Sequence, residues 1–354
     1  MPNWLRICIA ACFYYSGLVK LVLWWRLRSG RSLVILNYHR ASGGDLPSHL
    51  LYLRRHYRLL HLETALEELY KPCKEELQRG ERRPLLVLTF DDGYYDNYTH
   101  GYALASELQV PITIFLIPGY IESGNHFWWL EADRLVRHTQ LDQVLIEGHT
   151  FHLDQGEERK ALVQIIDARL CYAASVAERE AFLASTRKVL AAPSSATAEE
   201  TLALPLTWEQ VREMEQSGWI SFGAHTMHHP ALAYLTDLAE VKREVVESRA
   251  VLEQQLGHPV RIFAYPFGKP EYIGDNGLRT VQQAGYDWAV TTIPGFNTPQ
   301  SNPYLLRRLN AGVHQHWLVL AAEAAGIWGF FSRLLRVRIP FALKHLRTSF
   351  GGNI

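Results

Sequence analysis

The feature that most constrains the fold is an alternation of short apolar runs with amphipathic helical patterns. Seven runs rich in Val, Ile, Leu and Phe lie along the chain, and helical periodicity fills most of the intervals between them. Strands separated by helices pair in parallel, because a parallel neighbour needs a long crossover connection. The predicted strands are 33–37, 58–61, 85–90, 110–116, 219–222, 261–264 and 287–291.

This number of strands favours a closed or nearly closed barrel, and a doubly wound open sheet is the alternative. The interval 137–206 breaks the rhythm, because it holds two short polar strands, a charged helical stretch and a run of small residues. We therefore predict an α/β barrel with an inserted segment beside the binding site. The predicted helices include 97–108, 208–216, 238–256 and 277–284.

The composition is that of an ordinary globular protein. The 354 residues are 48% apolar and 20% charged, which suits one large domain with a buried core. Lys+Arg and Asp+Glu are equal at 36 each, so no global basic field points to a nucleic-acid partner. The four cysteines are scattered and form neither a disulfide framework nor a Cys-x-x-Cys metal site.

Both ends of the chain carry apolar stretches flanked by Trp and basic residues. Residues 7–19 are uncharged, and the stretch reaches the length of a membrane span only if Lys20 extends its amine to the interface. A signal-type apolar region, an interfacial helix and a packed N-terminal helix are the competing interpretations. Residues 317–347 combine an apolar part with five basic residues, and a helix that closes the domain is the alternative there.

These features divide the chain into three parts. Residues 1–30 are interpreted as a candidate membrane anchor, 31–315 as the main domain and 316–354 as an amphipathic basic tail. We accordingly expect a membrane-associated protein, on a side of the membrane that the sequence does not specify.

Two adjacent carboxylates follow the predicted strand 85–90. The strand ends in Asp91-Asp92-Gly93, and the carboxyl ends of barrel strands carry the active site. Adjacent side chains at a strand end point in different directions, so one carboxylate can bind a metal ion while the other faces the substrate. An ordinary Asp-Asp-Gly turn is the alternative.

A histidine cluster follows the strand 219–222. His225 and His229 are four residues apart, so a helical turn would bring both imidazoles to one face, with His228 off that face. A surface turn rich in His is the alternative. With one Asp, this pair makes a catalytic metal set that leaves positions open for water and substrate. Zinc suits these ligands best, and Co²⁺, Mn²⁺ or Fe²⁺ could occupy the same set.

A third group follows the strand 261–264, in Tyr265-Pro266-Phe267-Gly268. Proline fixes φ and glycine permits an unusual one, so the turn can hold a backbone N–H toward the site. Such a donor could stabilise an oxyanion. An ordinary strand-ending turn is the alternative.

Taken in order, TFDDG (89–93), His-Thr-x-x-His (225–229) and Tyr-Pro-Phe-Gly (265–268) resemble three motifs of the polysaccharide deacetylase superfamily. This superfamily comprises the NodB homology domain and carbohydrate esterase family four. The resemblance extends from residue 32 to residue 309. The segment 37–40, Asn-Tyr-His-Arg, resembles the branch that deacetylates exported poly-N-acetylglucosamine, and 127–129, Phe-Trp-Trp, resembles members found with surface-polysaccharide biosynthesis.

The resemblance implies a distorted (β/α)7 barrel and a hydrolase that removes an acetyl group from an N-acetylated sugar of a surface polysaccharide or its precursor. It also implies that Asp92, His225 and His229 bind one divalent metal ion, that Asp91 is the general base and that the Phe267 N–H holds the oxyanion. A deacylase of a lipid-linked sugar and a non-catalytic glycan-binding module of the same fold are the alternatives. The bacterial cell envelope is the expected location.

The sequence departs from this family pattern at Ala264. Many members carry Arg at that position, where it orients the catalytic Asp. Here Arg261, Arg307 or Arg308 would have to substitute, and the sequence does not select among them.

The general acid is a second open assignment. In the common arrangement of the family a late Leu-x-His motif supplies it, and His314 and His316 lie about where that motif would be sought. In the circularly rearranged branch an early Tyr-His pair supplies it, and His39 follows the first predicted strand, as barrel chemistry requires. We therefore predict His39 as the acid. Three tryptophans are candidates for stacking on sugar rings, and packing in the core is the alternative for each: Trp128, Trp129 and Trp288.

Overall fold

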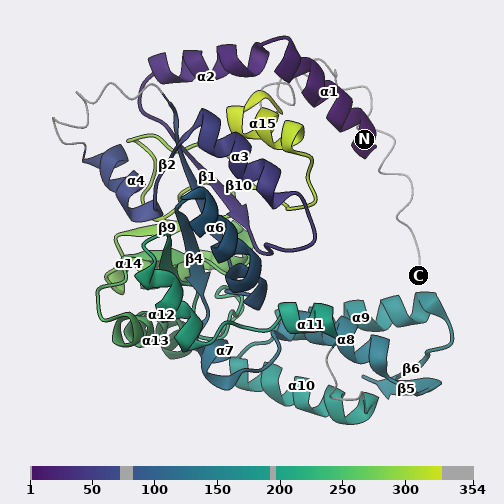
Figure 1. Ribbon diagram of the computed structural model, residues 1–354. Coiled ribbons are helices and arrows are strands. Elements are labelled where there is room, and N and C mark those ends of the chain that lie inside the picture. The colour runs from purple at the N-terminus through teal and green to yellow at the C-terminus, as the bar shows by residue number, and fades with distance from the viewer. Residues whose placement is uncertain (1, 72–82, 192–196, 329–354) are drawn as a thin grey trace, which may run out of the picture. The chain divides into compact units, whose positions relative to one another are not determined.

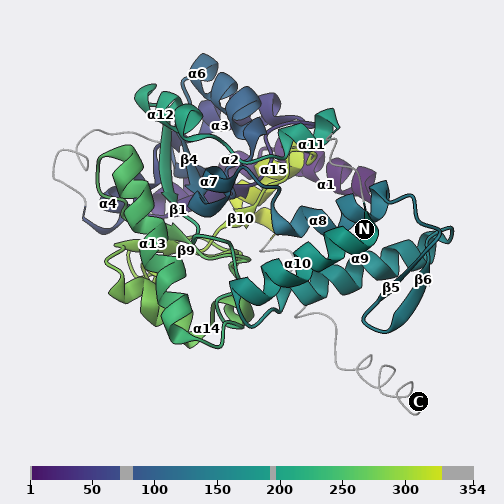
Figure 2. The same cartoon turned by 90° about the horizontal axis from the view of Figure 1, so that it is seen from below.

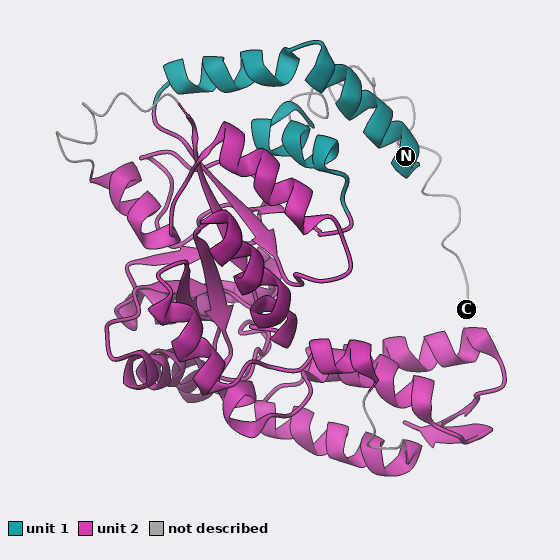
Figure 3. Ribbon diagram, viewed as in Figure 1, with its two compact units in different colours: residues 1–30, 315–354 teal, residues 31–314 magenta. Residues whose placement is uncertain are grey.

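The computed structural model describes residues 2–71, 83–191 and 197–328. The chain divides into two compact units, one formed by residues 31–314 and the other by residues 1–30 together with 315–354 (Figure 3). Each unit has its own secondary structure, and they are described separately.

The larger unit is built on one curled parallel sheet (Figure 1). Its strands follow the order β10-β1-β3-β4-β7-β8-β9, and β2 pairs with β3 beside this path. All six residues of β1 and all five of β4 are buried, as expected for parallel strands covered on both faces. The strands are β1 (Leu33–Tyr38), β2 (Arg58–Leu59), β3 (Leu85–Phe90), β4 (Ile112–Leu116), β7 (Ile220–Ala224), β8 (Ile262–Ala264), β9 (Trp288–Val290) and β10 (Leu309–Asn310).

Residues 303–310 bridge the two ends of this sheet. The Ala289 N–H donates to the Pro303 carbonyl, and the Thr291 N–H donates to the Leu306 carbonyl, so this segment lies along β9. A few residues later β10 pairs with β1 in parallel. The sheet therefore forms the distorted barrel that the sequence predicted, and the open doubly wound alternative is wrong.

The strand and helix predictions are largely confirmed. All seven predicted strands form, α12 and α13 have the predicted bounds, and the missed strand is the two-residue β10. The predicted helix 97–108 begins as the π-helix η1 (Asn97–Tyr102) and continues as α6. The other helices of the barrel are α3 (Leu46–His56), α4 (Leu62–Tyr70), α6 (Ala103–Leu108), α7 (Pro118–Ser123), α12 (Trp208–Gln216), α13 (Leu238–Leu256) and α14 (Pro270–Gln283).

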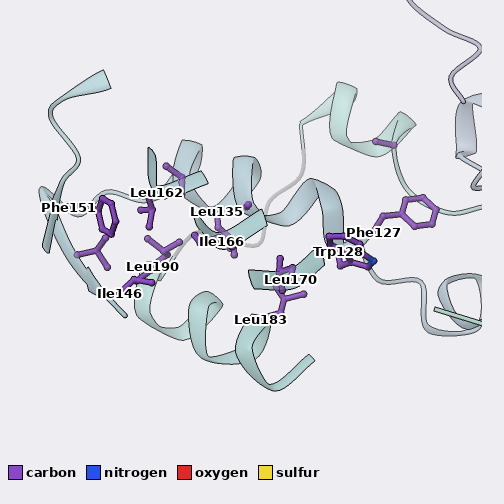
Figure 4. Packing of buried hydrophobic residues seen from close by; sticks show 14 of the residues in the cluster. Phe127, Trp128, Leu135, Ile146, Phe151, Leu162, Ile166, Leu170, Leu183 and Leu190 are labelled. Carbon is purple, nitrogen blue, oxygen red and sulfur yellow. The ribbon is translucent and has the colours of Figure 1, made fainter. Parts of the chain in front are cut away.

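Between β4 and β7 the chain leaves the barrel and forms a helical layer with its own core. Leucine side chains of α8, α9 and α10 pack against one another there, together with residues of the hairpin β5–β6 (Figure 4). Figures 1 and 2 both show α9 and α10 extending away from the strands, with the hairpin at the far end. The layer comprises α8 (Trp128–His138), β5 (Gln143–Ile146), β6 (His149–His152), α9 (Gly156–Cys171), α10 (Val176–Leu190) and α11 (Ala198–Leu202).

The smaller unit joins the two ends of the chain. It contains α1 (Asn3–Tyr15), α2 (Leu18–Arg28) and α15 (Trp317–Ala325). Arg6 pairs with Glu323 at 3.1 Å, and Arg26 donates to the Ala324 carbonyl, so the N-terminal helices hold α15.

The helices α1 and α2 meet at an angle of 64° around Gly17, whose φ of 81° is readily adopted only by glycine. Within the described residues, no single helix has the length and hydropathy of a membrane span, although α1 and α2 reach them together. Residues 329–354 of the predicted basic tail lie outside the described residues.

Candidate active site

The chemistry-bearing residues meet at the carboxyl ends of the barrel strands. Asp91 and Asp92 follow β3, His225 and His229 follow β7, and Phe267 follows β8. Because β3, β4, β7 and β8 are successive neighbours in the sheet, these residues share one edge of the barrel.

Asp92, His225 and His229 form a compact buried group. One potential ligand atom from each lies within 4.8 Å of the other two. Asp92 Oδ1 is 3.5 Å from His225 Nε2 and 3.8 Å from His229 Nε2, which is too long for good hydrogen bonds. No described residue hydrogen-bonds to Asp92 Oδ1, although it is buried. A buried carboxylate oxygen that faces two imidazole nitrogens without a partner has the surroundings that a cation would complete.

Both histidines direct Nε2 toward Asp92, and in a neutral imidazole this nitrogen can bind a cation. His225 Nδ1 lies 2.7 Å from the Ala264 carbonyl, which fixes the tautomer that leaves the Nε2 lone pair free for a ligand. Burial, assisted by the neighbouring His225, lowers the pKa of His229 to about 3. A metal ligand must be deprotonated, so this low pKa favours binding of a cation.

The two histidines lie on a loop, so the helical turn inferred from their spacing is wrong. Thr226 and His229 have φ of 64° and 55°, which no right-handed helix contains. The N–H groups of Met227 and His228 donate to the backbone carbonyl and the side chain of Glu244 on α13 instead of to preceding carbonyls. The Thr226 hydroxyl accepts from the His229 N–H at 2.9 Å, which holds the second histidine in place. His228 turns away and binds Glu244 through Nδ1 at 2.6 Å.

Left-handed backbone conformations gather around this group. Asp92 and Phe267 have φ of 75° and 59°, in addition to Thr226 and His229. Such conformations are costly for residues other than glycine and persist where the surrounding structure enforces them, typically at functional sites.

Asp91 pairs with Arg308. The guanidinium donates to both Asp91 carboxylate oxygens, each at 2.7 Å. The same side chain is buried and also donates to the Thr291 carbonyl, the Asn37 side chain and the Thr89 hydroxyl, at 2.8–3.1 Å. Burial alone would raise the pKa of Asp91, but the charge and hydrogen bonds of Arg308, together with the nearby His225 and His39, hold that pKa well below its usual range.

Arg308 is therefore the arginine that the sequence could not select. Arg261 pairs with Asp287 and Glu67 in the outer part of the barrel, and Arg307 donates to the Pro294 carbonyl. Arg308 is separated from Asp91 by 217 positions, and it immediately precedes β10, the strand that the sequence analysis missed. Without that strand, nothing in the sequence brings residue 308 beside β1 and β3.

His39 lies near Asp91, as the prediction of an early general acid requires. Its Nε2 is 4.0 Å from Asp91 Oδ2, and its side chain is 47% exposed, so it can reach both the base and a substrate. The loop after it is held by the buried Asp96, whose Oδ2 accepts bonds from Arg40 and from the loop residues 41 and 42, at 2.7–3.1 Å. Asn97 donates to the His39 carbonyl at 3.0 Å.

The two alternative candidates for the general acid, His314 and His316, lie beside residues other than the two aspartates. His316 caps α15 in the smaller unit and accepts from the Leu318 N–H. His314 lies beside Gly43 in the larger unit. Among the described residues, neither forms a hydrogen bond or an ion pair with Asp91 or Asp92.

Aromatic residues of the inserted layer cover one side of His229. The Trp129 ring lies 4.4 Å from the His229 ring and stacks on Phe127 at 4.8 Å. Two of the three candidate sugar-stacking tryptophans are buried, so packing is the correct interpretation for them. Trp128 donates to the His229 carbonyl, and Trp288 packs in the barrel core. Trp129 remains partly exposed.

The turn after β8 leaves the Phe267 amide available. The Phe267 carbonyl accepts from the Thr292 hydroxyl at 2.7 Å, which fixes the peptide on its C-terminal side. Gly268 has φ of 66°, and a Cβ there would collide with the Thr292 backbone, so only glycine fits. Among the described residues, no group accepts a hydrogen bond from the Phe267 N–H.

Comparison with known proteins relates this chain to deacetylases. The model of the family described as polysaccharide deacetylase matches residues 78–204 and 173–289, which contain both aspartates, both histidines and Phe267. YxkH of Bacillus subtilis (strain 168), provisionally named a polysaccharide deacetylase, is 22% identical over 290 residues, which is 81% of this chain and 74% of that protein.

Two solved structures have a similar fold. The Streptococcus pyogenes deacetylase PplD, in complex with acetate, superposes with a TM-score of 0.53 at 19% identity, covering 83% of this chain and 99% of that one. IcaB from Ammonifex degensii also gives a TM-score of 0.53 at 19% identity, covering 84% of this chain and 98% of the other.

Proposed function

Because the chain belongs to the polysaccharide deacetylase family and is therefore a carbohydrate deacetylase, we propose that it removes the acetyl group of an N-acetylated sugar in a surface polysaccharide or its precursor, with the help of one divalent metal ion. The observation that carries the metal dependence is the unpartnered, buried Asp92 Oδ1 facing two imidazole nitrogens.

Asp92, His225 and His229 would hold the ion. Three nitrogen and oxygen ligands leave positions open for water and substrate, and zinc is the metal that suits such a set best. When bound, a divalent ion would polarise the acetyl carbonyl and lower the pKa of a coordinated water.

The other site residues move the protons. Asp91, kept ionised by Arg308, accepts the proton of the water that attacks the acetyl carbonyl; each carboxylate oxygen keeps a lone pair beyond its bond to the guanidinium. The Phe267 N–H donates to the oxyanion that forms. His39, in its protonated form, donates to the departing nitrogen as the C–N bond breaks, so that acetate and a free amine leave.

The test is acetate release from N-acetylglucosamine oligomers before and after removal of metal by a chelator. We expect about one equivalent of divalent metal in the purified protein, loss of activity after chelation and recovery on adding zinc. His225→Ala should lose both metal and activity. His228→Gln is the matched control, since His228 binds Glu244 instead, and it should keep its metal. Full activity after rigorous chelation would exclude metal dependence.

Exposed aromatic residues of the smaller unit support membrane association in the bacterial cell envelope. Trp4, Trp24 and Trp25 are all exposed, and residues 1–30 contain four basic residues and no acidic one. Tryptophan beside Lys and Arg is typical of helices that lie at an anionic membrane surface. The same feature favours a lipid-linked sugar as a second candidate substrate.

The membrane proposal is tested by sedimentation of the full chain with lipid vesicles. Vesicles that contain anionic lipid should pellet the protein more than zwitterionic ones. Replacing Trp24 and Trp25 by Ala should weaken this binding without changing acetate release from soluble oligomers. Equal recovery in the supernatant with and without anionic vesicles would contradict the proposal.

A further inference from the structure

Three tyrosines from separate parts of the larger unit form a row of rings that ends at the candidate active site. Tyr172 follows α9 of the inserted layer, Tyr234 lies in the loop after the histidine cluster, and Tyr272 lies in the first turn of α14. We call these three residues the tyrosine row. None of them belongs to the metal set or to the groups that move protons.

The row is continuous with the site. The Tyr172 and Tyr234 ring centroids are 4.8 Å apart, and those of Tyr234 and Tyr272 are 6.2 Å apart. Tyr272 stacks on Phe267 at 4.6 Å with an interplanar angle of 23°, and the Phe267 ring lies 5.2 Å from that of His229. Aromatic surface therefore extends step by step from a candidate metal ligand to the outside of the unit.

Main-chain hydrogen bonds, and not only ring contacts, hold the three segments of the row together. The Ala233 N–H donates to the Tyr272 carbonyl at 2.9 Å, and the Thr236 N–H donates to the Ala174 carbonyl at 3.1 Å. Gly274 allows α14 to approach the loop at Ala233 closely, because a Cβ at position 274 would lie 3.0 Å from the Ala233 Cβ. The three segments are tied by main-chain bonds, so the rings are preorganised.

The outer rings are more exposed than packing alone would require. Tyr172 is 48% exposed and Tyr234 is 37% exposed, whereas Tyr57 and Tyr286 are buried in the same unit. Large apolar side chains left open beside a catalytic site are typical of ligand-binding surfaces.

Tyrosine suits a sugar ring as a partner. Its ring offers a rigid apolar face to the C–H groups of a sugar, and its hydroxyl can exchange hydrogen bonds with sugar hydroxyls. A polymer bound at the metal centre continues beyond the residue that is deacetylated, and the row begins at Phe267, next to the candidate metal ligand His229.

We propose that the tyrosine row is a subsite that binds a sugar residue one or more units away from the residue whose acetyl group is removed. This inference rests on the proposed function. Binding energy from a remote part of the substrate can be used at the reacting centre, so the subsite makes longer oligomers better substrates.

The experiment measures kcat/KM for acetate release by the zinc-loaded full chain from N-acetylglucosamine oligomers of two to six units. For the wild type we expect a rise with length of roughly tenfold, on the scale of one or two aromatic contacts. Tyr172→Ala and Tyr234→Ala should flatten this rise and leave the dimer rate unchanged. Tyr172→Phe is the matched control, because it retains the ring and should retain most of the rise.

Tyr98→Ala is a second control. Tyr98 stacks between Tyr95 and Tyr102 outside the row, and its removal should leave the length dependence intact. Tyr172→Ala or Tyr234→Ala variants that keep the full rise, or a wild type with equal kcat/KM at every length, would overturn the subsite and leave the proposed function standing. A wild type that releases no acetate from any oligomer would overturn both.

Discussion

Asp91 and Asp92 are neighbours in the chain, yet the two halves of the site that they face differ in how negative charge is balanced. On the Asp91 side, a buried guanidinium donates to both carboxylate oxygens. On the Asp92 side, one buried oxygen has no hydrogen-bond partner among the described residues and faces two imidazoles. Asp92 follows Asp91 in a turn with φ of 75°, and this change in backbone direction separates the two environments.

The hydrogen-bond partners of Asp91 therefore lie within the protein, whereas Asp92 has a buried oxygen that a cation would complete. A general base must remain ionised and must not bind the metal ion. The pairing with Arg308 meets both conditions for Asp91. A metal ligand must leave an oxygen uncommitted, and Asp92 does so. Substitutions on the two sides should therefore have separable effects on metal content and on catalysis.

The largest expected effect comes from exchanging each carboxylate for its amide. Asp91→Asn should keep the metal and lower kcat by about 10²–10⁴-fold, because the amide cannot accept the proton. Asp92→Asn should lose the metal. Metal analysis and acetate release on the same preparations would check this. Metal lost from Asp91→Asn and retained in Asp92→Asn would mean that the two roles are reversed.

Removing Arg308 tests the Asp91 half directly. Arg308→Met leaves an unpaired buried carboxylate, which should lower the free energy of unfolding by about 3–5 kcal/mol. Urea denaturation measures this, and Arg307→Met, at the neighbouring position, should change it little. A stable Arg308→Met protein with normal kcat would show that the guanidinium neither supports nor orients the base.

The same variant has a pH signature. In the wild type the pKa of Asp91 is depressed, so its contribution to stability is present above its unfolded value and is lost only as the pH falls through the lower folded value. Without Arg308, only the weaker effects of His225 and His39 oppose burial, so that pKa rises. The acidic limb of kcat/KM should therefore move to higher pH in Arg308→Lys or Arg308→Met, provided that the variant folds. If the acidic limb of kcat/KM stays at the same pH, that limb reports the titration of a group other than Asp91.

The prediction that His39 is the general acid can be tested together with Asp96, which holds the loop after His39. His39→Ala should lose about 10²-fold in kcat with metal retained, whereas His314→Ala and His316→Ala should be near normal. Asp96→Asn should cost about tenfold, because it weakens the bonds from Arg40 and from the loop backbone. Normal turnover in His39→Ala would end the assignment.

The smallest expected effect comes from an ion pair outside the site. Burial lowers the pKa of His258, but the hydrogen bonds to Glu215, at 2.7 Å, and to the Pro259 carbonyl, with the charges of Glu215 and Glu63, together raise it above the usual value. Its contribution to stability is therefore complete below about pH 6.5 and is lost as the pH rises through the folded value, opposite to Asp91. The His258 side chain is 50% exposed, so His258→Asn should cost less than about 0.5 kcal/mol at pH 6 and nothing at pH 9. Equal costs at both pH values would exclude an electrostatic origin.

The sequence by itself determined most of the barrel and the residues at its strand ends. β3 and the aspartates after it are contiguous, so one stretch of sequence specifies both the strand and the position of the carboxylates. The helices α12 and α13 could be predicted to the residue, because periodicity and N-cap residues such as Thr207 and Asp237 are local signals. The conformation of the loop that carries His225 and His229 could not be predicted, because its N–H groups donate to Glu244 on a separate element, the helix α13.

Only the tertiary structure decided which arginine serves Asp91 and which tyrosines meet beside Phe267. Arg308 reaches Asp91 because β10 pairs with β1, and a two-residue strand carries no periodic signal. Tyr172, Tyr234 and Tyr272 come from three segments whose contact depends on main-chain bonds between distant parts of the chain. Local patterns report which residues share a strand or a helix, whereas these contacts depend on how the elements pair and pack, and spacing along the sequence does not encode that.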